Sequence, residues 1–475
     1  MSVIMRYVST RGLAPAASFE DALLAGLARD GGLFLPETWP RLSPEGIDGI
    51  GDASFADAAA VCLAPFVGRW IDGGELRVLM GRAFSAFDRK EVALLVRLGE
   101  RDWLLELFHG PTLAFKDIAM QALGLMFDRA LAEKGTRATI IGATSGDTGA
   151  AAIEAFRGRD QIDIFILHPA GKVSDVQRRM MTTAAEANVF NIAVDGAFDD
   201  CQRLVKALFG DEEFKNRVRL SAVNSINWAR LAVQVVYYFT GLAQLEKGGG
   251  GRSASFCVPT GNFGDAFAGY AAQRMGARID RLALGVNRND ILRRALATGI
   301  YRPARTEATT SPAMDIQVAS NFERLLFEAS DRDSAALRDL MKRLDEEGGF
   351  EIPTAWLERI GALFDCASVS EDENKATIAR VFRENGMLVD PHTAVGLAAA
   401  RKLRDEGRLT GDVITLATAH PAKFPDAVSA ATGKTPALPE RLRGLFDRPE
   451  RCVSAPADPV AIRDLVLARS RAAKH

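Results

Sequence analysis

One lysine of this chain occupies a position suited to covalent chemistry. Lys116 lies in the turn-forming segment FHGPTLAFKD, which runs into a helix predicted to stop at Gly135. The start of a helix is its positive end, so an ammonium ion is disfavoured there, and burial between Phe115 and Ile118 acts in the same direction. A lysine with a lowered pKa is what a Schiff-base catalyst needs. The alternative is an ordinary solvated lysine at the surface.

A glycine-rich segment follows the apolar strand predicted at 138–141. It reads GATSGDTG from Gly142 to Gly149 and opens a helix predicted from about Thr148. Its glycines let the backbone approach a ligand, its hydroxyls donate hydrogen bonds, and the free amides of the helix start attract an anion. It matches neither an ATP P-loop nor a dinucleotide fingerprint. The segment predicts a carboxylate or phosphate pocket, with a plain strand-to-helix turn as the alternative.

The same order of strand, glycine loop and helix start recurs in PTGNFGD, residues 259–265. Backbone N–H groups at such a turn form an anion cradle. Two cradles at the carboxyl ends of parallel strands suggest a ligand with two anionic parts, or a cofactor beside a substrate.

Two further polar clusters complete the set. In NSINWAR, residues 224–230, Asn227 could be merely a helix N-cap, whereas the fork of Arg230 suits a phosphate oxyanion. In ATAHPAKF, residues 417–424, Thr418 follows an apolar strand. A hydroxyl at the carboxyl end of a strand lines a cleft or caps the next helix.

The elements that must position these residues are short apolar runs alternating with helical stretches. This alternation is typical of βαβ units and predicts an α/β fold with parallel sheets covered by helices on both faces. The predicted strands are 138–141, 162–167, 189–194, 256–258, 282–286 and 413–416.

Other regions lack such motifs. Residues 1 to about 95 are predicted to form a mostly helical N-terminal domain, with helices at 19–29 and 55–66. The run Gly248–Gly251 predicts a flexible connection. Residues 305–385 are predicted to form helices with charged faces, which serve packing and solubility and take no part in the chemistry.

The composition of the 475 residues narrows the function classes. Fifty-nine basic and 61 acidic side chains leave a net charge of −2, so no overall field draws the chain to nucleic acid or an anionic membrane. The five cysteines form no CxxC pair, which indicates a reducing, cytoplasmic location. The five histidines lack metal-binding spacing, so no metal is expected. No membrane span or secretory signal is predicted.

Taken together, five motifs and the N-terminal region resemble threonine synthases, pyridoxal phosphate enzymes of the tryptophan synthase β-subunit fold (fold type II). The motifs are HGPTLAFKD, GATSGDTGAAA, NSINWARLAVQ, PTGNFGDAFAG and ATAHPAKF, and the opening YVSTRG…SFEDALLAGLARDGGLFLPE is similar to the N-terminal domain of the longer bacterial and fungal subgroup. The resemblance implies an N-terminal domain at 1–95 and a catalytic region at 96–475. Within the catalytic region, a smaller α/β subdomain covers roughly 110–215 and the remainder forms a larger one.

The resemblance also implies roles for single residues. Lys116 would bind pyridoxal 5'-phosphate through a Schiff base and then serve as acid and base, and Thr418 would face the pyridine nitrogen. The cofactor phosphate would be held by Gly261, Asn262, Phe263, Gly264 and Asp265. The substrate carboxylate and the cofactor's 3'-oxygen would be bound by Ser145, Gly146, Asp147 and Thr148, and the substrate phosphate by Asn224, Ser225 and Arg230.

The reaction so implied is the conversion of O-phospho-L-homoserine and water to L-threonine and phosphate by γ-elimination and β-addition. Two alternatives stay open: a phospho-lyase that releases 2-oxobutyrate from the same substrate, and a non-catalytic binding protein that kept the fold. The expected partner is this small-molecule substrate, with no nucleic acid or membrane, and a monomer is favoured over an oligomer.

Overall fold

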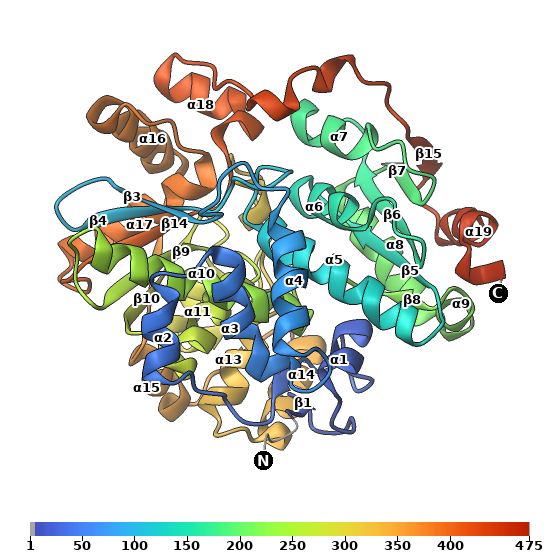
Figure 1. Cartoon of the computed structure of the whole chain (residues 1–475), viewed down its shortest axis with the longest axis horizontal. Helices are drawn as coiled ribbons and strands as arrows, with labels where there is room; N and C mark the ends of the chain where they lie inside the picture. The colour runs from blue at the N-terminus through green and yellow to red at the C-terminus, as the bar shows by residue number, and fades with distance from the viewer. Residues whose placement is uncertain (1–4, 475) are drawn as a thin grey trace.

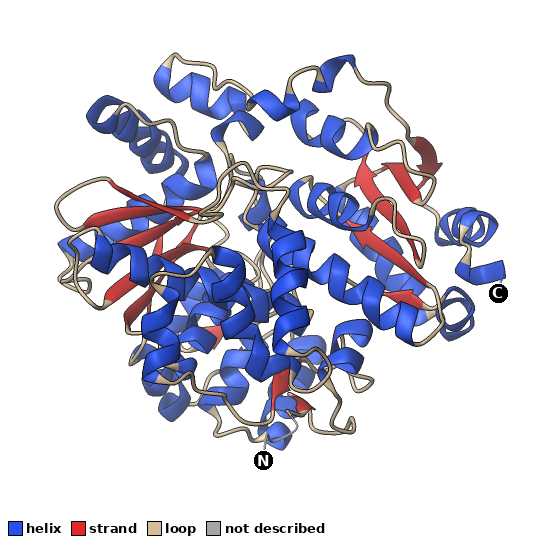
Figure 2. Ribbon diagram, viewed as in Figure 1, coloured by secondary structure: helices blue, strands red, loops and turns tan. Residues whose placement is uncertain are grey.

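Two parallel sheets organise the chain, and Figures 1 and 2 show them on opposite sides of the molecule. The computed structural model describes residues 5–474. The larger sheet has six strands in the order β13-β10-β9-β14-β4-β3, all parallel except the edge strand β3. Its strands are β3 (Leu94–Arg97), β4 (Asp102–Glu106), β9 (Ala254–Pro259), β10 (Ile279–Val286), β13 (Phe364–Ser368) and β14 (Val413–Ala417).

The smaller sheet has five strands, all parallel, in the order β15-β7-β6-β5-β8. They are β5 (Ala138–Ala143), β6 (Ile162–Pro169), β7 (Val189–Asp195), β8 (Leu220–Ser221) and β15 (Val453–Pro456). Every residue of the central β6 is buried, as expected for a strand with helices on both faces. The six strands predicted from apolar runs are all confirmed, as β5, β6, β7, β9, β10 and β14.

Helices cover both faces of each sheet. Around the smaller sheet, one face packs on α5 (Lys116–Glu133), α6 (Asp147–Phe156) and α7 (Asp175–Thr182), and the other on α8 (Phe198–Gly210), α9 (Glu212–Val218) and α19 (Pro459–Arg469). Around the larger sheet, α10 (Trp228–Lys247) and α11 (Gly264–Met275) lie on one face, and α16 (Glu371–Asn385) and α17 (Pro391–Asp405) on the other. The remaining helices of this part are α12 (Ile291–Thr298), α13 (Phe322–Ala329), α14 (Ser334–Glu347), α15 (Thr354–Gly361) and α18 (Pro425–Thr432).

The N-terminal region is mostly helical, as predicted, and its helices α3 (Phe55–Val67) and α4 (Gly73–Phe84) lie between the two sheets in Figure 1. Its core centres on Trp228 of α10, which is fully buried and touches the rings of Phe66, Tyr7 and Trp39 at centroid distances of 5.5, 6.2 and 5.9 Å. Its elements are β1 (Tyr7–Ser9), α1 (Phe19–Ala25), β2 (Phe34–Pro36), α2 (Pro44–Ile50), α3 (Phe55–Val67) and α4 (Gly73–Phe84). The helix predicted at 19–29 is shorter because Gly26, at φ 68°, caps it.

The sheets do not follow the sequence limits expected from the resemblance. The strand β3 begins at Leu94 and pairs with β4, so a boundary at residue 95 falls inside a strand of the larger sheet. The smaller sheet takes in β8 and β15, both beyond residue 215, and in Figure 1 the red C-terminal segment runs from α18 across to β15 and α19. The smaller subdomain is therefore built from two separate stretches of chain.

The prediction that residues 305–385 form helices with charged faces and take no part in the chemistry is wrong for the first part of this segment. Between β11 (Ile300–Tyr301) and α13 the chain is irregular except for the single turn η1 (Pro312–Met314), and this segment lines the main cavity. Its composition explains the difference, because TEATTSPAM is rich in residues that favour turns. Among the described residues, no helix has both the length and the apolar character that a membrane crossing requires.

Candidate active site

A cavity of about 740 Å³ receives residues from both sheets and from all five motifs. Its volume suits a small-molecule ligand, for which about 300 to 1,000 Å³ is typical. Of the residues predicted for the site, only Gly146 does not line it. The others do: Lys116, Ser145, Asp147, Thr148, Asn224, Ser225, Arg230, Gly261, Asn262, Phe263, Gly264, Asp265 and Thr418.

Hydrogen bonds hold the loop that leads into α5 and carries Lys116 at its end. The carboxylate of Asp117 is fully buried and accepts hydrogen bonds from the backbone N–H and the hydroxyl of Thr112, at 2.8 and 2.6 Å. The N–H of Phe115 donates to the carbonyl of Thr418 at 2.9 Å. Lys116 and Thr418 are thus held beside each other although they are about 300 positions apart in the sequence. Burial raises the pKa of Asp117 to about 6.

The side chain of Lys116 meets a carboxylate. Its Nζ lies 3.3 Å from Oδ2 of Asp147 at the start of α6, and both side chains are nearly buried. Burial lowers the pKa of the Lys116 ammonium; Asp147 opposes this, while Lys423 and Arg230 act with it. The direction and its largest cause, burial, are those expected from the sequence; the charges of Asp147, Lys423 and Arg230 are added by the fold. A lysine so placed can release its proton more readily than a solvated one.

The first glycine loop forms an open cradle at the start of α6. The hydroxyl of Thr144 accepts from the N–H groups of Gly146 and Gly149, both at 2.9 Å, which closes the turn from within. Within the described part of the chain, the backbone N–H groups of Asp147 and Thr148 have no hydrogen-bond acceptor. Gly146 has φ 138°, and a Cβ placed there would lie 2.5 Å from the Gln177 side chain. The loop therefore needs glycine both for its backbone shape and for this close contact.

The second glycine loop forms another cradle at the start of α11. Phe263 adopts the left-handed conformation, with φ 64°, and its fully buried ring packs edge-on against Phe322 at a centroid distance of 5.5 Å. Packing of the ring holds a backbone shape that a non-glycine residue rarely adopts. Across residues 5–474, nothing accepts from the N–H groups of Phe263, Gly264 or Asp265. These donors are available to an anion at the helix start.

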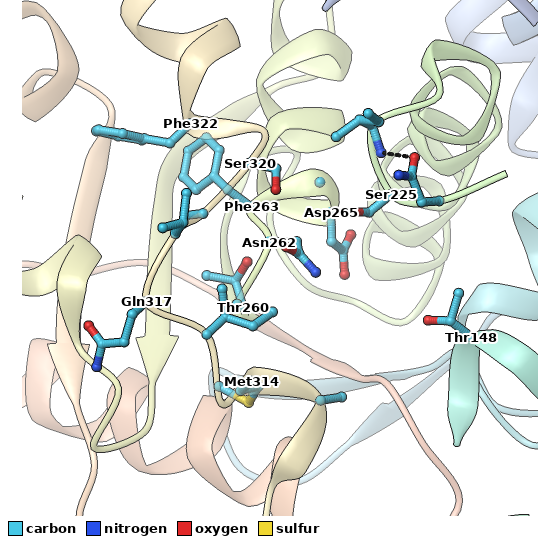
Figure 3. A pocket seen from close by; sticks show the side chains of 18 of the residues that line it. Thr148, Ser225, Thr260, Asn262, Phe263, Asp265, Met314, Gln317, Ser320 and Phe322 are labelled. Atoms are coloured by element: carbon cyan, nitrogen blue, oxygen red, sulfur yellow. Dashed lines mark hydrogen bonds between the residues drawn. The ribbon is translucent and has the colours of Figure 1, made fainter. Parts of the chain in front are cut away.

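The two carboxylate oxygens of Asp265 differ in their hydrogen bonding. Oδ1 accepts hydrogen bonds from the hydroxyls of Tyr237 and Tyr238 of α10. Oδ2 is buried and has no hydrogen-bond partner among the described residues. Figure 3 shows the carboxyl group pointing into the cavity beside Asn262, with Thr148 of the smaller subdomain across from them. Burial raises the pKa of Asp265 to about 6, even though both tyrosine hydroxyls stabilise the anion.

The start of α10 contributes a buried cation. Asn227 caps the helix by accepting from the N–H of Ala229 at 3.1 Å, so the N-cap reading of this residue is confirmed. Arg230 is 2 % exposed, and its Nη1 donates to the carbonyl of Val223 at 3.1 Å while its Nε lacks an acceptor in the described chain. One turn later, Gln234 also lines the cavity with an unpaired buried Oε1. Buried groups with unmet hydrogen-bonding capacity are expected at a ligand site.

Several residues of the site were missed by the sequence analysis. The irregular segment before α13 packs against the second glycine loop, with Met314 and Ile316 beside Gly261, and also lines the cavity. Arg11 of the N-terminal region also reaches the cavity. Behind the cavity, Lys423 is fully buried against Asp147. Lys423 lies within the motif ATAHPAKF, but only its complete burial, which the sequence does not reveal, sets it apart from a surface lysine.

Comparison with known proteins places most of the chain in known families. Residues 6–84 match the family model "Threonine synthase N terminus", residues 93–350 match "Pyridoxal-phosphate dependent enzyme", and residues 393–466 match "Threonine synthase, C-terminal". The threonine synthase of Pseudomonas aeruginosa is 48% identical over 97% of this chain and 98% of its own length.

Solved structures give the same result. The structure of pyridoxal phosphate-bound threonine synthase from Brucella melitensis superposes with a TM-score of 0.94 at 50% identity, covering 98% of this chain and all of the other. The yeast threonine synthase structure superposes with a TM-score of 0.93 at 37% identity, covering 98% of this chain and 99% of the other.

Proposed function

The chain belongs to the threonine synthase family of pyridoxal phosphate-dependent enzymes, and on that premise we propose how its residues divide the work of the reaction. Its function is the conversion of O-phospho-L-homoserine and water to L-threonine and phosphate. The observation that carries the assignment of residues is the meeting of a nearly buried Lys116, whose pKa is lowered by burial, with two open N–H cradles in one cavity.

The donor set fits the cofactor. Lys116 supplies the amine, the unpartnered N–H groups of Phe263, Gly264 and Asp265 suit its phosphate, and Gly261 and Asn262 shape that loop. Thr418 would place a neutral hydroxyl at the pyridine nitrogen. A hydroxyl suits an uncharged ring nitrogen, whereas a carboxylate would favour a protonated one. When bound, pyridoxal phosphate withdraws electrons from Cα of the substrate and so makes the protons of Cα and Cβ removable.

Lys116 then moves protons at the substrate carbons. Its amine takes the Cα proton, a second proton leaves Cβ, and the phosphate group departs from Cγ with its bonding electrons. Water then adds its oxygen at Cβ, and protons return to Cγ and Cα to give the methyl group and the amino acid. The lowered pKa of Lys116 supports this exchange because a general base works best when its pKa lies near the working pH.

The anionic ends of the substrate have separate sites. The loop of Ser145, Gly146 and Thr148 would hold the carboxylate, and Asp147 would interact with the cofactor's 3'-oxygen. Asn224, Ser225 and Arg230 hold the phosphate. The unpaired Nε of Arg230 supports this role, because a buried guanidinium without a carboxylate partner is stabilised by an anionic ligand.

Product analysis tests the function. Full-length protein with pyridoxal phosphate is incubated with O-phospho-L-homoserine, and phosphate, threonine and 2-oxobutyrate are measured together. We expect one threonine for each phosphate. Phosphate accompanied by 2-oxobutyrate would instead establish the phospho-lyase, and neither product would point to the non-catalytic alternative.

We further infer that the chain acts as a monomer in the cytoplasm. The cavity takes residues from all five motifs of this chain, which supports a site that a single copy can form. The five cysteines are all unpaired, which supports a reducing compartment. Light scattering of the purified protein and fractionation of the source cells test these two inferences, and a dimer or a membrane fraction would contradict them.

A further inference from the structure

A second lysine is buried behind the candidate active site. Lys423 ends the short helix η2 (Pro421–Lys423) that follows β14 of the larger sheet, and its side chain has no exposed surface. Its Nζ lies 2.5 Å from Oδ1 of Asp147 and donates to the carbonyl of Thr112 at 2.9 Å. A fully buried ammonium ion is costly unless it is paired, so this contact is a specific feature of the fold.

Asp147 divides its two oxygens between two lysines. Oδ1 forms an ion pair with Nζ of Lys423 and accepts a hydrogen bond, at 2.7 Å, from Nε2 of Gln177 on α7, while Oδ2 faces Nζ of Lys116 at 3.3 Å. The carboxylate belongs to α6 of the smaller subdomain, whereas Lys423 belongs to η2, which follows β14 of the larger sheet. The chain therefore holds a buried row of alternating charge, Lys116–Asp147–Lys423, that crosses from one subdomain to the other.

We propose that Lys423 is a positioning residue that lowers the proton affinity of Lys116 by offsetting the negative charge of Asp147. Without Lys423, the full negative charge of Asp147 would act on Lys116 and hold it as an ammonium ion. With Lys423 in place, a positive charge offsets that of the Asp147 carboxylate, which still orients the amine of Lys116 but does not hold its proton. The inference rests on the proposed role of Lys116 as the lysine that binds the cofactor.

The electrostatics of the site agree with this arrangement. Burial alone would raise the pKa of the Asp147 carboxyl, but Lys423 and Lys116 outweigh it and hold that pKa far below its usual range. Asp147 is thus anionic at every working pH and cannot itself be the proton carrier. The other charged groups that act on Lys116 or Asp147 are Arg230 of α10, Asp265 of α11 and His392 of α17.

The test compares four variants by a pH titration of the resting holoenzyme. The visible absorbance of the bound cofactor reports the proton on the Lys116 nitrogen. We expect K423M to raise the titration midpoint by about 1 to 2 pH units and D147N to lower it by a similar amount, because each removes one charge of the buried row. The double variant D147N/K423M removes both charges and returns close to the wild-type midpoint. K423R keeps the charge and stays there as well.

A second readout does not need the cofactor. In the full-length chain stripped of pyridoxal phosphate, the rate at which an amine-directed reagent modifies Lys116 is followed by mass spectrometry across pH. Below the pKa this rate falls about tenfold for each unit by which the pKa rises, so K423M is modified about 10 to 100 times more slowly. K134M, which removes an exposed cation from the far end of α5, serves as the matched control and leaves the rate unchanged.

The opposite signs separate this proposal from a purely structural role. If K423M and D147N move the midpoint in the same direction, or if folded K423M leaves it unchanged, Lys423 only supports the fold and the inference fails. If K423M does not fold, D147N and the double variant decide, since adding the Lys423 change to D147N must raise the midpoint. K116A tests the underlying assignment separately, because survival of the visible band in that variant means that another lysine holds the cofactor.

Discussion

Arg11 of the N-terminal region and Glu323 of α13 form an ion pair at the edge of the cavity, with Nη2 of Arg11 lying 3.3 Å from Oε2 of Glu323. Glu323 also accepts from the hydroxyl of Thr10 at 2.6 Å and is only 9 % exposed. The N-terminal region is therefore a wall of the site and not an appendage to it.

Breaking this pair should impair both stability and substrate binding. R11M leaves the nearly buried carboxylate of Glu323 without its cation, and we expect a loss of about 1 to 3 kcal/mol in the free energy of unfolding together with a higher KM for the anionic substrate. Denaturant unfolding and steady-state kinetics measure the two effects. R6M breaks the exposed pair of Arg6 with Glu37 in the same region and should change neither. Equal effects of R6M and R11M would contradict the special position of Arg11.

The sequence predicted the parts of the fold that depend on local pattern. All six strands found from apolar runs are present, and the helix that opens at Lys116 ends at Glu133, one residue before the Lys134 C-cap and two before Gly135. Strand-to-helix turns with glycine were recognisable because only glycine tolerates conformations such as that of Gly146. These features are set by neighbours in the chain, so a single sequence reveals them.

Features set by distant contacts could not be predicted in this way. The short strand β15 joins the smaller sheet from the C-terminal end of the chain, which no pattern within residues 110–215 indicates. Lys423 and Arg11 look like ordinary surface cations until the fold buries the first and brings the second to the cavity. Their roles depend on partners about 280 to 310 positions away in the sequence.

Gly146 should be needed for function beyond its backbone conformation. In G146A the new Cβ would meet the side chain of Gln177 at 2.5 Å, which displaces Gln177 from Asp147 and distorts the proposed carboxylate cradle. We expect a fall in kcat/KM of about 10- to 100-fold, alongside a loss of about 1 to 3 kcal/mol in stability from the positive φ. G135A is the control, because Gly135 also has a positive φ, of 58°, but no atom lies within 4 Å of its Cβ position. It should lose stability and keep its activity; if G135A loses as much activity as G146A, the contact with Gln177 is irrelevant.

Asp265 should make the stability of the protein depend on pH. Burial raises its pKa to about 6 from an ordinary value of 3.8, so the folded chain binds its proton more tightly than the unfolded chain does. The stability that this proton provides is complete below about pH 4 and is lost as the pH rises through about 6. D265N removes the ionisation, and we expect it to be up to about 3 kcal/mol more stable than the wild type at pH 8.

Below pH 4 the difference between D265N and the wild type should vanish, because the wild-type carboxyl is then neutral as well. Thermal unfolding at both pH values measures this. Asp117, whose pKa is also raised to about 6, remains in both proteins, so part of the wild-type pH dependence should persist in D265N. A constant difference between the two proteins at all pH values would show that Asp265 is not the titrating group.

Arg230 should act on the substrate phosphate and little on the fold of the site. Its guanidinium is almost fully buried and burial lowers its pKa to about 10, yet its Nε has no acceptor among the described residues, so an anionic ligand is its missing partner. R230M removes a charge-assisted contact worth about 1.5 to 3 kcal/mol, and we expect KM for O-phospho-L-homoserine to rise by about 10- to 100-fold. Inhibition by inorganic phosphate should weaken in parallel, since the product occupies the same place.

R230K keeps the positive charge of Arg230 but not its forked guanidinium, so its KM should fall between those of the wild type and R230M. Unchanged KM and phosphate inhibition in folded R230M would move the phosphate site elsewhere in the cavity, with Arg11 as the next cation to test.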